Sequence, residues 1–164
     1  MVSPTFREEP QAKDSANIAR IVRNTGFFTS DELDIAVSLV RERLDKGEAS
    51  LYYFVFAEMG NRVIGYTCYG PIPGTVNGFD LYWIAVDPEF QGFGAGRSLL
   101  AYTERKVRAK HGLRLYAETS STFQYASTRS FYENNGFLLE GRLVDYYAPD
   151  DDKLLYVKHL SSKP

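Results

Sequence analysis

Cysteine and histidine are scarce in this sequence of 164 residues, which contains one cysteine, Cys68, and two histidines, His111 and His159. A single cysteine cannot form an intramolecular disulfide, and these scattered residues lack the spacing of metal ligands. We therefore expect a reduced protein that works without a metal, and a cytoplasmic location.

An excess of charge of one sign and long apolar runs are also absent. The 19 Lys and Arg residues nearly balance the 21 Asp and Glu residues, giving a net charge of -2 that disfavours general nucleic-acid binding. No apolar run approaches the roughly 18 to 20 residues that span a bilayer. Residues 1–10 show no basic stretch followed by an apolar core, so we expect neither membrane association nor a secretory signal.

The length and the hydrophobic content of 44% predict a single domain over residues 1–164 with its own buried core. Asp14 is positioned to cap a first helix, and a second helix from Ser30 or Asp31 to Gly47 places Leu44 on its apolar stripe. The glycine-rich turn at residues 91–96 precedes a third helix that ends near residue 111, and a fourth covers residues 125–134. Strands are predicted at residues 5–9, 51–58, 62–69, 79–86, 113–118, 137–147 and 153–160. This order predicts an α/β (α+β) fold, with helices on both faces of a mixed sheet.

The turn Gln91-Gly92-Phe93-Gly94-Ala95-Gly96 lies directly between a predicted strand and a predicted helix. The first turn of a helix has backbone N–H groups without internal acceptors, so this arrangement suits an anion such as a pyrophosphate. A Walker loop would require a lysine where Arg97 stands, and the dinucleotide fingerprint would require a glycine at position 97 or 99. Nucleotide triphosphatases and Rossmann dehydrogenases are therefore disfavoured.

The segment Gln91-x-x-Gly94-x-Gly96 after Trp83-Ile84-Ala85-Val86-Asp87-Pro88 resembles the coenzyme A loop of the GCN5-related N-acetyltransferase (GNAT) superfamily. The stretch from Thr128 to Phe137, with Phe131-Tyr132-Glu133-Asn134-Asn135-Gly136, resembles the second conserved block of that superfamily at the expected distance downstream. The resemblance covers nearly the whole chain. It implies the GNAT fold, with a mostly antiparallel central sheet of about seven strands and about four helices, and acetyl coenzyme A (acetyl-CoA) as the cofactor.

The resemblance also implies which residues bind the cofactor. The amides from Gln91 through Arg97 would hold the pyrophosphate with help from the helix dipole, and Gly94 and Gly96 would avoid crowding the phosphate oxygens. Backbone groups of Ile84 and Val86 would bind the pantetheine arm. The full set of expected cofactor-binding residues is Ile84, Ala85, Val86, Gln91, Gly92, Phe93, Gly94, Ala95, Gly96, Arg97, Ser98 and Phe131.

Acetyl transfer to an amine requires a general acid and a general base. Tyr132 stands where the superfamily has a tyrosine near the coenzyme sulfur, so it is the expected acid. Glu118 and Asp80, on two predicted strands, are the candidate bases, with Glu118 preferred and a water relay as an alternative. The superfamily often has an asparagine seven residues before the tyrosine, but this sequence has Tyr125 there, so Thr119-Ser120-Ser121-Thr122 become the expected polar contacts.

The expected acceptor is a primary amine of a small molecule, bound by Phe27, Phe28, Asp145, Tyr146 and Tyr147. Rings attract cations, and the four aspartates Asp145, Asp150, Asp151 and Asp152 predict a negative rim, although a run of charges in a turn is also typical of a solvated hairpin. Two alternatives remain open. Residues 142–147 resemble the Arg-x-x-x-Tyr-Tyr pattern of ribosomal-protein N-terminal acetyltransferases, and a sensor that binds acetyl-CoA without turnover would keep the same pocket. The assembly is expected to be a monomer or a homodimer.

Overall fold

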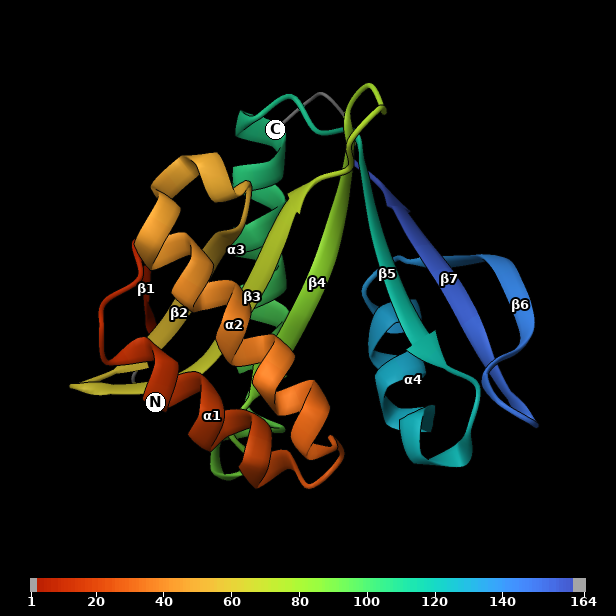
Figure 1. The fold of residues 1–164 in the computed structure, drawn as a ribbon, viewed down its shortest axis with the longest axis horizontal. Helices are drawn as coiled ribbons and strands as arrows, with labels where there is room; N and C mark the ends of the chain where they lie inside the picture. The colour runs from red at the N-terminus through yellow and green to blue at the C-terminus, as the bar shows by residue number, and fades with distance from the viewer. Residues whose placement is uncertain (1–2, 161–164) are drawn as a thin grey trace. The chain divides into compact units, whose positions relative to one another are not determined.

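The computed structural model describes residues 3–160, within which seven strands form one mixed sheet (Figure 1). The strand order is β1-β2-β3-β4-β5-β7-β6. β4 and β5 pair in parallel, whereas the pairs β1–β2, β2–β3, β5–β7 and β6–β7 are antiparallel. The strands are β1 (Thr5–Arg7), β2 (Tyr53–Met59), β3 (Arg62–Pro71), β4 (Gly78–Val86), β5 (Arg114–Ser120), β6 (Leu138–Ala148) and β7 (Asp151–His159).

Four α-helices accompany the sheet in the described part of the chain: α1 (Asp14–Thr25), α2 (Ser30–Lys46), α3 (Ala95–Ala109) and α4 (Ala126–Asn134). The predicted mixed, mostly antiparallel sheet of seven strands with four helices is confirmed. The chain divides into two compact units. The first comprises the chain up to Gly70 together with Tyr82–Lys106, and the second comprises Pro71–Leu81 together with the chain from Val107 onward. The single domain over residues 1–164 stays a prediction.

In the first unit, helices cover both faces of β2 and β3 (Figure 1). α1 and α2 contribute Ile18 and Val40 to a core shared with Phe54 and Tyr66, all of them fully or almost fully buried. On the opposite face, the buried hydroxyls of Thr67 on β3 and Thr103 on α3 share a hydrogen bond of 2.7 Å. Burial of this much apolar surface supplies the main driving force for folding of the unit.

Gly65 allows β3 to approach β4 and α3 closely. A Cβ atom at this position would lie 2.9 Å from the carbonyl oxygen of Ala85 and 3.0 Å from the Leu99 side chain. Because such contacts are shorter than real Cβ contacts, only glycine fits without displacement of its neighbours. The close approach fixes the end of β4 immediately before the glycine-rich turn.

Two details of the predicted helices are wrong. Asp14 does not cap α1; its carboxylate is fully buried and accepts hydrogen bonds from Arg7, at 2.8 and 3.1 Å, and from the amide of Gln11. Asp14, the first residue of α1, is therefore joined to β1 by its ion pair with Arg7. Leu44, predicted on the apolar stripe of α2, is 41% exposed, and Arg43 is buried instead with its guanidinium over the ring of Tyr53.

The second unit contains the C-terminal strands β5, β7 and β6 and the helix α4 (Figure 1). Tyr132 of α4 packs its ring against Tyr156 of β7 and against Phe137, with centroid separations of 5.8 and 5.2 Å. Ala117 of β5 lies beside Tyr156 in the register, so Ala117 shares the face of the sheet that α4 covers. The alternate residues of β5, including Glu118, lie on the other face.

Candidate active site

The glycine-rich turn of the first unit has the backbone geometry of an anion-binding loop. Gly92 and Gly94 adopt positive φ angles of 80° and 84°, and a Cβ atom at either position would meet nothing within 4 Å. The first α-helical hydrogen bond of α3 runs from the Ser98 amide to the Gly94 carbonyl at 3.0 Å. The amides of the preceding helical residues have no acceptor within the helix, so they can hold a negatively charged group.

One predicted donor of this turn is used within the protein. The amide of Gln91 donates to the carbonyl of Pro88 at 3.3 Å, and its side-chain Nε2 donates to the carbonyl of Val86 at 2.9 Å. Gln91 therefore fastens the turn to the end of β4, and its backbone N–H is not free for a phosphate. Binding of a pyrophosphate by the later amides, up to that of Arg97, stays a prediction.

The other predicted cofactor-binding residues lie along β4 and the start of α3. Ala85, Val86 and Ala95 are buried, whereas Phe93 is exposed at the tip of the turn. Ile84 precedes the buried pair on β4, Gly96 and Arg97 follow Ala95 in the first turn of α3, and Ser98 closes that turn. These residues form one continuous strand-turn-helix segment, as the sequence predicts.

Sequence reasoning missed the ion-pair network that anchors this segment. Asp87 is almost completely buried, and its carboxylate pairs with Arg20 of α1 and, at 3.0 Å, with Arg62 of β3. Arg20 also donates to the carbonyl of Val63 at 2.6 Å, and Arg62 pairs with Glu89 at 2.7 Å. Because a buried carboxylate is costly without such partners, these contacts hold the chain at the point where β4 ends and the turn begins.

In the second unit, Tyr132 is buried among aromatic rings. Its centroid lies 5.9 Å from that of Phe131, the remaining predicted cofactor-binding residue, in addition to the contacts with Phe137 and Tyr156. Burial raises the pKa of the Tyr132 hydroxyl above its ordinary value. The phenol therefore keeps its proton at neutral pH, as a proton donor must.

The two candidate bases share one face of the sheet in the second unit. Asp80 of β4 pairs in register with Tyr116 of β5, and Glu118 lies two residues further along β5. Burial raises the pKa of Asp80 to about 6, the negative charge of Glu118 adds to this effect, and the positive charge of Lys153 opposes it. Asp80 is thus ionised at neutral pH and is a stronger base than an ordinary aspartate.

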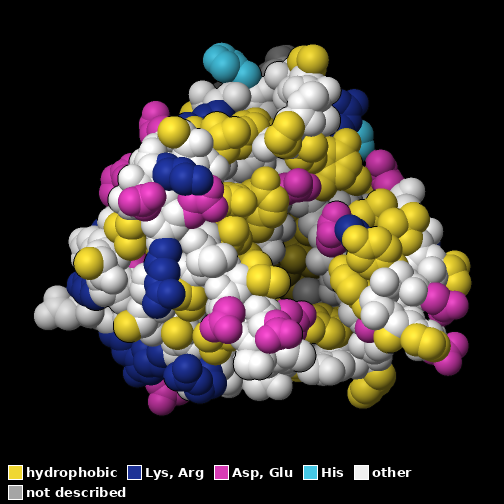
Figure 2. Space-filling model, in the orientation of Figure 1, with side chains coloured by type: hydrophobic (Ala, Val, Ile, Leu, Met, Phe, Trp, Pro, Cys, Tyr) yellow, Lys and Arg dark blue, Asp and Glu magenta, His cyan; other side chains and the backbone are white. Residues whose placement is uncertain are grey.

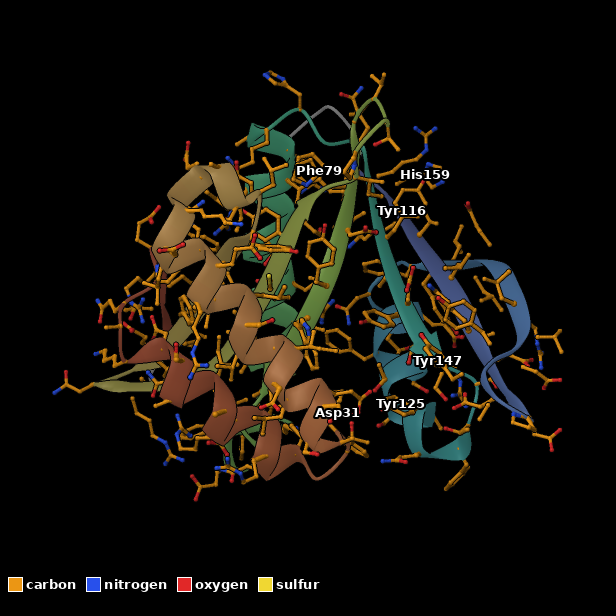
Figure 3. The ribbon with its side chains drawn as sticks, in the orientation of Figure 1. Asp31, Phe79, Tyr116, Tyr125, Tyr147 and His159 are labelled. Atoms are coloured by element: carbon orange, nitrogen blue, oxygen red, sulfur yellow. The ribbon has the colours of Figure 1, made fainter. Side chains whose placement is uncertain are left out.

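Lys153 of β7 is a site residue that sequence reasoning did not select. Its ammonium nitrogen lies 2.6 Å from Oε2 of Glu118 and 4.5 Å from the ring centroid of Tyr146. Figure 2 shows acidic and basic side chains in contact with hydrophobic ones over β5, β6 and β7, and Figure 3 shows Tyr147 beside the C-terminal part of β5. Glu118 is thus engaged in an ion pair with Lys153.

The predicted negative rim is wrong for Asp152. This residue is buried, its carboxylate pairs with Arg142, and it accepts a hydrogen bond from the Asp145 amide at 2.8 Å. Asp145 in turn accepts a hydrogen bond from the amide of Asp150 at 2.9 Å, so its carboxylate helps to form the β6–β7 turn. Binding of an amine by Asp145 stays a prediction.

The predicted aromatic contacts differ between the two units. Phe28, in the first unit, packs on Trp83 with centroids 4.9 Å apart, and Phe27 is partly exposed. Tyr146 and Tyr147, in the second unit, are perpendicular to each other at 5.1 Å, and both are about half exposed. Tyr146 already holds a cation, Lys153, over its ring, which supports the predicted affinity of this pair for positive charge.

The polar loop after β5 is largely satisfied by its own contacts. Ser120 shares a hydrogen bond of 2.9 Å with Thr122, and Ser121 accepts one of 2.8 Å from the Asp152 amide. Arg129 of α4 donates to the carbonyls of Ser120 and Thr122. Among the described residues, the buried hydroxyl of Thr119 has no hydrogen-bond partner. Of the predicted polar contacts in the described chain, Thr119 therefore offers a buried hydroxyl that is available to a ligand.

Comparison with known proteins decides the family. The model of the acetyltransferase (GNAT) family matches residues 20–137. The crystal structure of a GNAT-family acetyltransferase from Desulfovibrio desulfuricans is 45% identical in sequence, with a TM-score of 0.95 over 97% of this chain and 100% of that chain. The chain belongs to the GNAT family. The family predicted from the two sequence motifs is confirmed, and the match includes the turn, α3 and α4.

Two more distant GNAT structures share the fold. The ribosomal-protein-S18-alanine N-acetyltransferase of Escherichia coli has a TM-score of 0.76 at 19% identity, covering 96% of this chain and 94% of that chain. An aminoglycoside 6'-N-acetyltransferase complexed with coenzyme A has a TM-score of 0.77 at 18% identity, covering 98% and 99%. Their acceptors differ, so the shared fold does not select one. None of the curated proteins matches the sequence of this chain.

Residues 3–160 contain neither a membrane-spanning helix nor a cluster of metal-ligating side chains. No helix in this range has the length and apolar character needed to cross a membrane. No group of three or more His, Cys, Asp and Glu side chains in this range is placed to hold a metal ion.

Replacement of Gly94 by valine tests the role of the turn in this GNAT protein. We expect Gly94→Val to abolish acetyl-CoA binding in calorimetry, because its side chain would enter the open space where a phosphate would lie. Gly74→Val is the matched control, since Gly74 has a similar φ of 77° and equally open surroundings in another loop. Both variants should lose similar stability from backbone strain, about 1 to 3 kcal/mol. Equal affinity of Gly94→Val and Gly74→Val for acetyl-CoA would contradict this role.

Proposed function

We propose that this GNAT protein transfers the acetyl group of acetyl-CoA directly to a primary amine of a small molecule, within a complex that contains both substrates. The observation that supports an amine acceptor is the raised pKa of Asp80. This half-buried carboxylate has a pKa of about 6 and lies on the same sheet face as Glu118. An ammonium ion must lose a proton before its nitrogen can attack, and a base with this pKa is ionised and effective near neutral pH.

Asp80 and Glu118 take different roles in this proposal. Because Lys153 holds Glu118 in an ion pair of 2.6 Å, Asp80 is the better proton acceptor, either directly or through water. Acetyl-CoA supplies the acetyl group as an activated thioester. The turn of Gly92 to Arg97 binds its pyrophosphate, and the backbone of Ile84 and Val86 binds its pantetheine arm.

Tyr132 completes the proposed proton transfers. Before the nitrogen attacks, Asp80 Oδ takes one proton from the ammonium, directly or through water, from the sheet face opposite α4. As the nitrogen–carbon bond forms and the carbon–sulfur bond breaks, the Tyr132 hydroxyl donates its proton to the departing sulfur, and the second proton lost by the nitrogen passes through water to the Tyr132 oxygen. Because burial raises the pKa of Tyr132, its hydroxyl stays protonated until negative charge develops on the departing sulfur. Because Tyr132 is buried among aromatic rings, a hydrogen bond from its hydroxyl to a developing negative charge is strengthened.

Thiol release and product mass test the proposed function. With acetyl-CoA, we expect release of coenzyme A and a monoacetylated product for small primary amines, and no such product for short peptides with a free N-terminus.

Asp80→Asn should lower kcat/KM about 100-fold or more, and kcat/KM of the native protein should fall as the pH drops through about 6, because Asp80 becomes protonated. Glu140→Gln, on the exposed strand β6, is the control for loss of a carboxylate.

Three outcomes of this assay would contradict the proposal. Acetylation of peptides alone would favour the N-terminal acetyltransferase. Acetyl-CoA binding without thiol release for any amine would favour the sensor. Full activity of Asp80→Asn with an unchanged pH profile would remove Asp80 from the mechanism.

Replacement of Tyr132 by phenylalanine separates proton donation from packing. We expect Tyr132→Phe to lower kcat about 100-fold with little change in acetyl-CoA affinity, because only the hydroxyl is lost and the ring contacts with Phe137 and Tyr156 are kept. Tyr156→Phe is a matched control, since its hydroxyl is bonded to Glu133 at 2.9 Å. An effect of Tyr132→Phe on KM alone would assign Tyr132 to packing.

A further inference from the structure

The strand registers place three charged residues in a row across one face of the sheet in the second unit. Asp80 of β4 lies beside Tyr116, two residues before Glu118 on β5. Leu155 of β7 is the partner of Glu118, and Lys153 lies two residues before it. Because side chains alternate between the faces of a strand, Asp80, Glu118 and Lys153 all lie on the face opposite α4.

This row of Asp80, Glu118 and Lys153 contains two carboxylates but only one ammonium. The Lys153 side chain is only 13% exposed, and its ammonium lies 2.6 Å from the Glu118 carboxylate and 4.5 Å from the Tyr146 ring centroid. Burial lowers the pKa of Lys153, but the hydrogen bond to Glu118, the negative charge of Glu118 and the two tyrosines Tyr146 and Tyr147 together outweigh it, so the net pKa is raised and the ammonium stays charged. The row therefore has one negative charge in excess when Asp80 is ionised.

Lys153 also occupies the place that a second external cation would need. Its ammonium covers the face of Tyr146, and the charges of Lys153 and Glu118 both act on the hydroxyl of Tyr147. An incoming ammonium can be balanced by Asp80, but a second one nearby would meet the like charge of Lys153. Like charges brought together at a binding site repel each other and so select between ligands.

We propose that Lys153 is a specificity-determining residue that restricts the acceptor to primary amines with a single positive charge. This inference rests on the proposed function and names its substrate class: the ammonium of the acceptor pairs with Asp80, while Lys153 neutralises Glu118 and repels a second cationic group. Removal of the Lys153 charge leaves Glu118 and the face of Tyr146 available to such a group.

Pentylamine and 1,5-diaminopentane test this inference, because they have the same chain length and differ by one ammonium group. Their affinities are measured by calorimetry at pH 8, where Asp80 is ionised, with no acetyl-CoA present, so that binding is separated from turnover. We expect the native protein to prefer pentylamine. Lys153→Met should shift the ratio of the two dissociation constants at least about tenfold toward the diamine.

Three further variants make the test specific. Lys153→Arg keeps the charge and should keep the native preference. Lys158→Met removes a lysine from the opposite face of the same strand and should also leave the preference unchanged. In Glu118→Gln, the Asp80 carboxylate is the remaining partner of the Lys153 ammonium, so the excess negative charge is lost and pentylamine binding should weaken about tenfold. This variant provides an independent test if Lys153→Met does not fold.

The inference is overturned if Lys153→Met and the native protein give the same ratio, or if Lys158→Met changes the ratio as much as Lys153→Met. If the amines bind with the expected pattern but no acetylated product forms, the proposed function fails and the binding specificity stands. If pentylamine is acetylated but the ratio of the two dissociation constants is the same in Lys153→Met and the native protein, the proposed function stands and this inference fails.

Discussion

The imbalance between two carboxylates and one ammonium on the sheet of the second unit is the constraint on which the proposed chemistry depends. Glu118 is neutralised by Lys153 at 2.6 Å, whereas the half-buried Asp80 feels the charge of Lys153 but forms no ion pair within residues 3–160. Burial and the nearby charge of Glu118 therefore raise the pKa of Asp80. The same imbalance makes Asp80 both a proton acceptor and a partner for an incoming ammonium, so binding and deprotonation of an amine have a common physical origin.

The first unit contributes a rigid backbone rather than reactive side chains. Gly65 lets β3 lie close to Ala85, and the buried carboxylate of Asp87 joins the end of β4 to Arg20 and Arg62. Between them, these contacts fix where the glycine-rich turn begins. A turn that binds an anion through backbone amides must hold them in place before the ligand arrives, because ordering them on binding would cost affinity.

The sequence was sufficient for the order of the strands and helices and for the family, because turn residues and hydrophobic periodicity are local signals. It was not sufficient for the partners of charged residues. Asp14 looked like a helix cap, but it pairs with Arg7 on another element. Asp152 looked like part of a solvated turn, but the hairpin buries it against Arg142. Lys153 meets Glu118 only through the register of β5 with β7, which no local pattern specifies.

The pKa of the Asp80 carboxyl group in the free protein tests the account most directly. It can be measured by a 13C NMR titration of the side-chain carboxyl carbon, assigned by its loss in Asp80→Asn. The account predicts a midpoint of about 6. A midpoint near 4, the ordinary value for an aspartate, would show that the carboxylate is neither desolvated nor affected by Glu118, and would contradict its role as the base.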